Sequence, residues 1–201
     1  SPAGGDSSSV ITIKGSDTML HLVTAWADAY MKSNSGAAVS VTGGGSGTGI
    51  ASLLNGTTSI CASSRDVNEE EQAMAAQKGL ELRPTVVARD AITIVVNPAN
   101  PVSELSMEQI KKIYTGAYTS WEQVGGPAEP IVVLSRESSS GTYMFFLEHV
   151  LNKEDYSSNA MLLPATSAII QSVTDSSWAI GYVGLGYAEE AAEKVKVLPV
   201  K

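Results

Sequence analysis

The segment VSVTGGGSGTGIASLL, at residues 39–54, predicts a strand, a glycine-rich loop and a short helix in direct succession. Val39–Thr42 alternates in the manner of a short strand. Ile50–Leu54 is an apolar helical turn that Asn55 and Gly56 would end. A strand that runs through glycines into a helix indicates a layered α/β protein. The backbone N–H groups at such a helix start are also suited to bind an anion.

Three further segments place hydroxyl and glycine residues just before an expected helix. They are Gly15–Thr18, Ser63–Arg65 and Arg136–Thr142. Each helix start offers unpaired N–H groups and the positive end of the helix dipole. One such site is common in proteins, whereas four in one small chain favour helix ends that converge on a single small oxyanion.

Strand and helix patterns alternate along the chain. We expect strands at residues 10–14, 39–42, 58–62, 86–97, 131–135, 179–183 and 195–200, and helices at 18–33, 50–54, 68–78, 105–114, 142–151 and 169–173. In the helix at 68–78, Asn68 and Glu71 have the spacing of a capping box. Because the anion segments mostly follow strands, they are expected at the carboxyl ends of a sheet.

The composition excludes several classes of function. The formal net charge of −8 disfavours non-specific binding to nucleic acid or to an acidic membrane. No stretch approaches the roughly 18–20 apolar residues of a membrane span. Cys61 is the only cysteine and His21 and His149 are the only histidines, so we expect neither an internal disulfide nor a zinc site. Residues 1–9 are predicted to be a disordered leader.

The glycine run at residues 43–49 allows several interpretations. A nucleotide-binding loop would need a Gly-Lys-Ser/Thr sequence, which is missing. A nucleophile elbow would need a glycine where Thr48 stands. A flexible surface loop remains an alternative. An anion-binding nest is favoured, because Ser46 supplies a hydroxyl and Gly47–Gly49 supply unobstructed N–H groups.

Arg136 begins the most specific of the four segments. Its guanidinium offers a planar fork for two oxygens of an anion. Ser140, Gly141 and Thr142 then offer hydroxyls and first-turn amides. The alternative is an ordinary helix cap beside a surface arginine.

Other candidate residues have strong structural explanations. Arg65 and Arg89 each precede an aspartate and can equally form a structural ion pair with it. The tryptophans are expected mainly in the core and the histidines in structural helix positions, and Cys61 is expected to be buried.

Together these segments resemble the phosphate-binding component of bacterial phosphate ABC transporters, from about Val10 to Leu198. The motifs that carry the resemblance are Gly15–Met19, Gly43–Gly49, Ala62–Arg65, Val96–Pro98, Tyr114–Gly116 with Trp121, Ser135–Thr142 and Ile180–Gly184. In combination they are far more specific than any one glycine run.

The resemblance implies an α/β fold of the two-lobed type II periplasmic binding protein class, which closes on phosphate in a cleft. Two crossover hinge strands are expected near residues 88–92 and 182–187. The first lobe would comprise residues 10–88 and 185–201, and the second lobe residues 89–184. By matched position, the phosphate-binding residues would be Ser16, Thr18, the Met19 amide, Ser46 and Ser64 from the first lobe, and Arg136, Ser140, Gly141 and Thr142 from the second.

The chain departs from the family pattern in two ways. Family members usually continue past a strand like 195–200 with elements that complete the first lobe, so the first lobe is expected to be incomplete and the chain truncated at its C-terminus. Some branches also carry an aspartate at the position of Ser64, where it accepts the proton of hydrogen phosphate. Asp90 is our first substitute for that acceptor and Asp17 the second.

The leading hypothesis is a non-catalytic, high-affinity receptor that delivers inorganic phosphate to a membrane ABC permease. Such a receptor would be exported to the periplasm or cell surface, act as a monomer and need no cofactor or metal. A receptor for sulfate, molybdate or tungstate is the first alternative, and a carboxylate in contact with the ligand would distinguish the two. A phosphohydrolase or acyl-transfer enzyme is the second alternative. It would need a base beside a nucleophile, and no anion segment contains a histidine.

Overall fold

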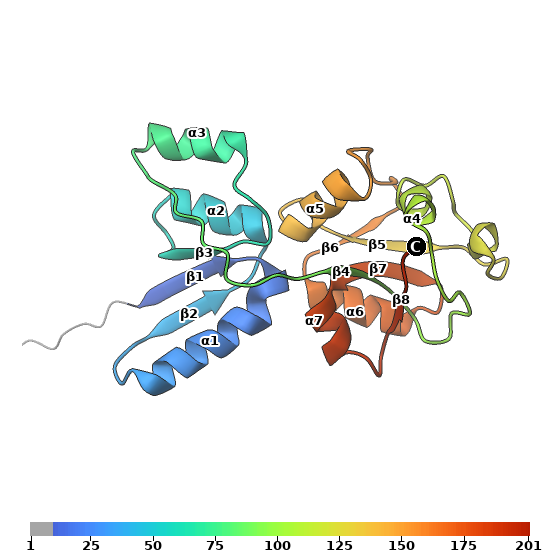
Figure 1. The fold of residues 1–201 in the computed structure, drawn as a ribbon, viewed down its shortest axis with the longest axis horizontal. Helices are drawn as coiled ribbons and strands as arrows, with labels where there is room; N and C mark the ends of the chain where they lie inside the picture. The colour runs from blue at the N-terminus through green and yellow to red at the C-terminus, as the bar shows by residue number, and fades with distance from the viewer. Residues whose placement is uncertain (1–9) are drawn as a thin grey trace, which may run out of the picture. The chain divides into compact units, whose positions relative to one another are not determined.

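The computed structural model describes residues 10–201, so the leader expected at residues 1–9 lies outside the described residues. The chain divides into two compact units, of which unit 1 ends at Pro84 and unit 2 begins at Thr85 (Figure 1). Each unit has its own sheet covered by helices, as the α/β prediction requires. In the described part of the chain, no helix is long and apolar enough to cross a membrane.

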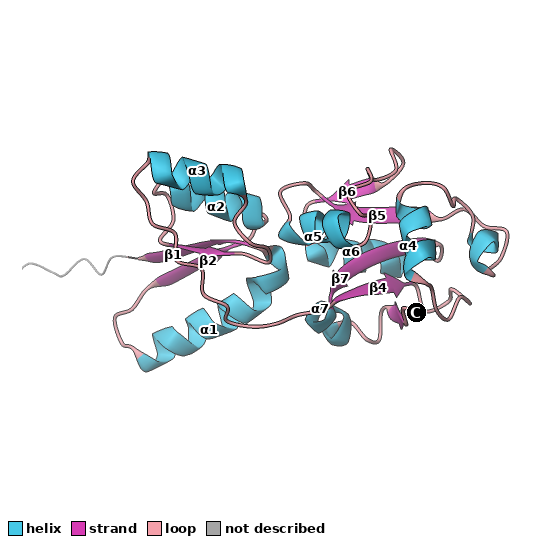
Figure 2. Ribbon diagram, turned by 45° about the horizontal axis from the view of Figure 1, so that its top comes forward, coloured by secondary structure: helices cyan, strands magenta, loops and turns pink. Residues whose placement is uncertain are grey.

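Unit 1 is built on a parallel sheet with the strand order β2-β1-β3. Its elements are β1 (Ile11–Gly15), a 3-10 turn η1 (Asp17–Met19), α1 (Leu20–Ser33), β2 (Val39–Thr42), α2 (Ser46–Leu54), β3 (Ile60–Ala62) and α3 (Glu69–Gln77). Helix α1 covers one face of the sheet, and α2 and α3 lie on the other (Figure 2). Because the strands are parallel, the loops that follow them all leave from the same edge.

Unit 2 contains a mixed sheet with the strand order β6-β5-β7-β4-β8. Its strands are β4 (Ile92–Val96), β5 (Val132–Arg136), β6 (Met161–Leu163), β7 (Ala179–Gly184) and β8 (Lys196–Leu198), and its helices are α4 (Met107–Tyr114), η2 (Trp121–Val124), α5 (Gly141–His149), α6 (Thr166–Asp175) and α7 (Leu185–Glu190). Strand β5 runs parallel to β6 and β7, whereas β4 is antiparallel to both of its neighbours.

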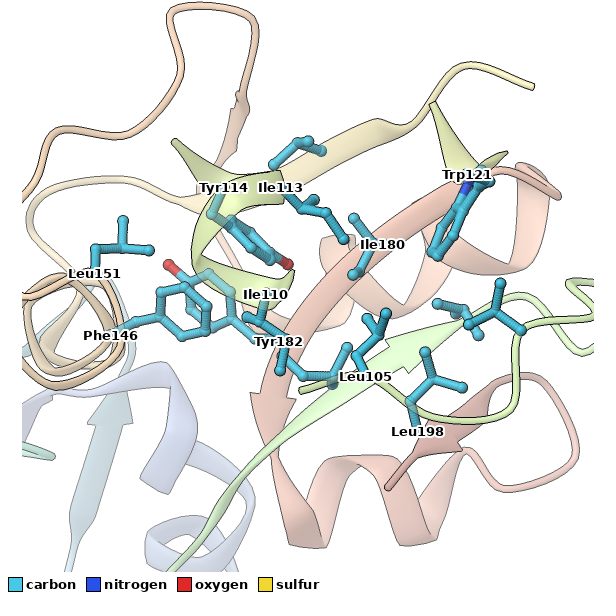
Figure 3. Packing of buried hydrophobic residues seen from close by; sticks show 14 residues of the cluster. Leu105, Ile110, Ile113, Tyr114, Trp121, Phe146, Leu151, Ile180, Tyr182 and Leu198 are labelled. Carbon is cyan, nitrogen blue, oxygen red and sulfur yellow. The ribbon is translucent and has the colours of Figure 1, made fainter. Parts of the chain in front are cut away.

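The sheet of unit 2 separates two hydrophobic clusters. Along β7, Ile180 and Tyr182 pack into one cluster while Ala179 and Val183 pack into the other, as strand alternation requires. The larger cluster contains a group of aromatic rings, in which Phe146 lies against Tyr182 and Tyr114 packs beside them (Figure 3). This core fixes β5 and α5, which carry the predicted arginine segment.

The C-terminal segment differs from its predicted place. We expected residues 185–201 in the first lobe, but β8 pairs with β4, with Leu198 opposite Ile94. Leu198 is buried in the same cluster as Ile94, so apolar burial holds this segment in unit 2. The expected hinge at residues 182–187 also stays within unit 2, where it forms the end of β7 and the start of α7.

Other differences have local causes. The apolar run at 86–97 predicted one long strand, but only Ile92–Val96 pairs, and Val86 is 85% exposed. Helix α2 begins at Ser46 rather than Ile50, despite the low helix propensity of glycine. The reason is close packing: a Cβ on Gly49 would lie 2.6 Å from the Cα of Gly15 in β1.

Candidate functional site

Three serines form a cluster of hydroxyl groups in unit 1. The Oγ of Ser16 donates to the Oγ of Ser64 at 2.9 Å, and the Oγ of Ser46 lies 3.2 Å from that same Ser64 oxygen. The backbone N–H of Ser64 donates to Ser46 Oγ at 3.1 Å. The structure thus brings together three residues that the sequence predicted as phosphate ligands. They come from the ends of β1 and β3 and from the start of α2.

The backbone around these serines keeps the loops close together. The N–H of Ser16 donates to the carbonyl of Ala62 at 2.8 Å, and the N–H of Gly45 donates to the carbonyl of Gly15 at 2.9 Å. Gly45 precedes α2 with a φ of 92°, a conformation that favours glycine. The glycine run is therefore an ordered entry into a helix rather than a flexible surface loop, and it directs the first N–H groups of α2 toward the edge of the sheet that carries the serines.

Asp17, Thr18 and Met19 form the η1 turn, which directly follows Ser16 of the serine cluster. The Met19 N–H, a predicted phosphate donor, donates to the Ser16 carbonyl at 3.2 Å. Asp17 is 7% exposed, and its Oδ1 accepts the N–H of Gly44 at 3.2 Å. A largely buried carboxylate therefore belongs to the same group of loops as the hydroxyls.

In unit 2, Arg136 ends β5 and is only 2% exposed, so it is not a surface arginine. Its Nε donates to the carbonyl of Leu163 at 3.2 Å, and its Nη2 donates to the carbonyl of Pro164 at 2.9 Å. Its Nη1 donates to the hydroxyl of Thr166 at 2.8 Å. The turn between β6 and α6 therefore supplies three acceptors that fix the plane of the guanidinium.

Helix α5 begins a few residues after Arg136. Ser140 caps it, with its Oγ accepting the N–H of Tyr143 at 3.3 Å, and Gly141 and Thr142 lie in the first turn. Ser140 and Thr142 are buried, at 2% and 4% exposure. A buried guanidinium and the positive end of a helix, joined by one short turn, make this part of unit 2 attractive to an anion.

A buried network of hydroxyl groups lies behind the arginine. The Oγ of Ser135 is 2.8 Å from the hydroxyl of Tyr182, which is 3.0 Å from the hydroxyl of Tyr156. The ring of Tyr182 stacks on Phe146 of α5, with centroids 4.1 Å apart. Burial raises the pKa of Tyr182, so this tyrosine stays neutral and ties β5 to α5. Local sequence patterns reveal neither this support nor Thr166, because both act across long sequence separations.

Two further predicted residues lie apart from these clusters. Asp90 is exposed, and its carboxylate accepts the N–H of the next residue, Ala91, at 2.8 Å. Arg65 forms an ion pair with Glu71 through two hydrogen bonds of 2.8 and 2.7 Å, and its Nη1 also donates to the backbone carbonyl of Asp66 at 2.8 Å. The guanidinium lowers the pKa of Glu71, which also completes the predicted capping box with Asn68. Arg65 therefore has a structural role.

The clusters contain donors in abundance and few groups suited to a metal. No group of three or more His, Cys, Asp or Glu side chains that could hold a metal ion occurs in residues 10–201. The two histidines lie within α1 and at the end of α5. What the arrangement offers chemically is a set of oriented hydroxyls, amides and one guanidinium, which are the groups that bind an oxyanion.

Comparisons with known proteins agree with this chemistry. A family model described as a PBP superfamily domain matches residues 1–200. The phosphate-binding protein PstS of Staphylococcus haemolyticus is 34% identical over 191 residues, which cover 94% of this chain and 60% of that protein. PstS of Borreliella burgdorferi is 31% identical, over 94% of this chain and 68% of the relative.

Solved structures of proteins named for phosphate transport are also similar to this chain. A candidate phosphate ABC transporter substrate-binding protein from Clostridium perfringens, solved with bound phosphate, superposes with a TM-score of 0.87 at 31% identity, covering 96% of this chain and 76% of that one. An ABC-type phosphate transport receptor from Vibrio cholerae superposes with a TM-score of 0.66 at 30% identity, with the same coverage. The chain thus spans about three fifths of the staphylococcal relative and three quarters of these two structures.

Proposed function

Because the chain belongs to the PBP superfamily and its relatives include phosphate-binding proteins, we propose that it binds inorganic phosphate through the donor groups of its two clusters. The predicted fold class, a two-lobed type II periplasmic binding protein, is confirmed by the structures that it matches. The observation that carries the proposal is the buried guanidinium of Arg136, held by acceptors at the end of β6 and the start of α6.

The proposed ligands are donors. In unit 1 they are the hydroxyls of Ser16, Thr18, Ser46 and Ser64 with the Met19 amide, and in unit 2 they are Arg136 and the Ser140, Gly141 and Thr142 groups at the start of α5. Neutral hydroxyls and amides bind an oxyanion without a balancing metal. Bidentate contact with a guanidinium adds both charge and direction. Of the two candidate carboxylates, Asp17 is better placed than Asp90 to accept a ligand's proton, because it is buried among the unit 1 loops.

We further propose that the chain acts in transport rather than catalysis. The relatives are named as binding proteins and transport receptors. A receptor of this kind would be exported and would deliver phosphate as a monomer to a membrane permease. The clusters suit this role, because they present oriented donors of the kind that bind an oxyanion.

Isothermal titration of the chain with phosphate and with sulfate tests the proposal. The titrations are run at about pH 5 and about pH 8, on either side of the second pKa of phosphate at roughly 7. We expect phosphate to bind and sulfate to bind far more weakly. No heat of binding with phosphate at either pH would refute the proposal, and tighter binding of sulfate would favour a receptor for another oxyanion.

A further inference from the structure

We propose that Tyr156 is a positioning residue for the oxyanion. Through a network of hydroxyl groups it holds the first turn of α5 against the strand that carries Arg136, and this contact sets the affinity for the anion. The inference rests on the proposed function, because Arg136 and the start of α5 are the proposed ligands in unit 2. Tyr156 lies between α5 and β6, outside the four segments predicted as anion sites.

The hydroxyl network, made by Ser135, Tyr182 and Tyr156, connects β5 to α5 inside unit 2. The Oγ of Ser135 is 2.8 Å from the hydroxyl of Tyr182, which is 3.0 Å from the hydroxyl of Tyr156. The Tyr156 hydroxyl donates to the backbone carbonyl of Tyr143 at 3.1 Å. Ser135 directly precedes Arg136 in β5, and Tyr143 lies in the first turn of α5. The network therefore joins two parts of unit 2 that are proposed to bind the same anion.

The hydroxyl network has a direction, because each hydroxyl carries a single hydrogen. Burial raises the pKa of Tyr156 and of Tyr182, so both phenols keep their hydrogens. The Tyr156 hydrogen is used on the Tyr143 carbonyl, so Tyr182 donates to Tyr156. Ser135 in turn donates to Tyr182 at 2.8 Å, since its other acceptor, the Arg136 carbonyl, is more distant at 3.3 Å. Loss of the Tyr156 hydroxyl thus removes the last link to α5 and one acceptor of Tyr182.

Tyr143 is the point at which the network reaches the proposed ligands. Its N–H donates to the Oγ of Ser140 at 3.3 Å, and its carbonyl accepts the Tyr156 hydroxyl. The ring of Tyr156 also stacks on that of Tyr143, with centroids 4.5 Å apart. Because Ser140 and the two residues after it supply the proposed hydroxyls and amides, displacement of Tyr143 displaces those donors. A change of Tyr156 to phenylalanine keeps the stacked ring and removes only the hydroxyl.

Two variants separate positioning from simple stability. Tyr156→Phe removes the last link of the network. Tyr114→Phe is the matched control, because the Tyr114 ring packs against Phe146 and Tyr182 (Figure 3), and its buried hydroxyl has no hydrogen-bond partner within residues 10–201. We expect Tyr156→Phe to weaken phosphate binding about fivefold, equivalent to about 1 kcal/mol. Tyr114→Phe should bind as the unaltered protein does. If Tyr156→Phe lowers only the free energy of urea unfolding, its role is structural and the inference is wrong.

Tyr182→Phe interrupts the network one link earlier and shows whether the network acts as a unit. The two tyrosine hydroxyls are in direct contact, so the effects of removing them are coupled. A protein that carries both Tyr156→Phe and Tyr182→Phe should therefore lose about as much phosphate affinity as Tyr156→Phe alone. Full additivity of the two losses would overturn the inference, as would unchanged affinity in Tyr156→Phe.

A second measurement does not depend on phosphate. Amide hydrogen exchange, recorded without ligand, reports local opening of the first turn of α5, and exchange of the β7 amides serves as the measure of global unfolding. The Tyr143 N–H should exchange faster in Tyr156→Phe and at the unaltered rate in Tyr114→Phe. If the unaltered protein fails to bind phosphate while exchange changes in this way, the proposed function is wrong and Tyr156 still fixes the start of α5. Equal exchange in all three proteins would show that Tyr156 does not position this helix.

Discussion

Replacement of Arg136 by lysine tests the binding proposal most directly. Lysine preserves the positive charge but has one nitrogen with three donors, whereas the guanidinium has five in a fixed plane. In the structure, the acceptors of these donors include the carbonyls of Leu163 and Pro164 and the hydroxyl of Thr166. A single ammonium group cannot satisfy these acceptors and also contact two oxygens of an anion.

The magnitude follows from the hydrogen bonds that would be lost. If the guanidinium binds the anion as proposed, Arg136→Lys removes at least one hydrogen bond to it, and a hydrogen bond to a charged group contributes about 1.5–3 kcal/mol. At 1.4 kcal/mol for each factor of ten, phosphate should bind about 10 to 150 times more weakly. The buried position supports this range, because at 2% exposure solvent screens the contact little.

The assay is isothermal titration with phosphate, combined with urea unfolding of each protein. Arg65→Lys is the matched control, since Arg65 is a partly buried arginine that forms two hydrogen bonds with Glu71. It should lower the free energy of unfolding and leave phosphate affinity unchanged. If Arg136→Lys unfolds cooperatively and binds phosphate as tightly as before, or if Arg65→Lys loses equal affinity, the assignment of the guanidinium to the ligand is wrong.

Three further substitutions test selectivity, acid stability and packing. Asp17→Asn should allow sulfate to bind while Asp90→Asn should not, because only the Asp17 carboxylate is buried among the donor loops. Competition titrations with phosphate and sulfate test this prediction. The reverse result would restore Asp90 as the proton acceptor. The ion pair with Arg65 lowers the pKa of Glu71. The stabilisation from this pair is therefore complete above the unfolded Glu71 pKa of about 4.5, and it is lost as the pH falls through the lower pKa of the folded state. Unfolding of Glu71→Gln should accordingly depend less on pH below about 4.5, whereas Glu108→Gln, in an exposed pair, should change little. Gly49→Ala should reduce the free energy of unfolding by about 1–3 kcal/mol, because its new Cβ would overlap the backbone of β1, and unchanged urea unfolding would contradict this packing.

The sequence predicted those parts of the fold that depend on local signals. The capping box predicted at Asn68 marks a real helix start, since Glu71 at the third position bonds back to the Asn68 backbone. Val39–Thr42 is a strand with the predicted bounds, because its alternation is short and clean. The serine segments were found because they place hydroxyls and glycines just before expected helices, and in unit 1 they follow strands of a parallel sheet.

Features that depend on distant partners could not be found in this way. Residues 195–200 read correctly as a strand, but nothing local tells whether that strand joins the first sheet or pairs with β4. Trp26 has the spacing of a buried helix face and is nevertheless 44% exposed. Thr166 could not be identified from local sequence either, because its contact is with Arg136, thirty residues earlier in the chain.

The two clusters also differ in how their donors are held, and this difference has a functional consequence. The unit 1 serines bond mainly to one another, so each hydroxyl can turn toward a new acceptor and exchange one partner for another. The acceptors of Arg136 include two backbone carbonyls and one buried hydroxyl, which hold the plane of its guanidinium fixed. Hydroxyls that can both donate and accept tolerate different protonation states of an anion, whereas a fixed guanidinium demands negative charge at one place. On this reasoning the unit 1 serines add hydrogen bonds without selecting a protonation state, and discrimination between protonated and unprotonated anions in unit 1 depends on the buried Asp17 carboxylate, which when ionised can only accept.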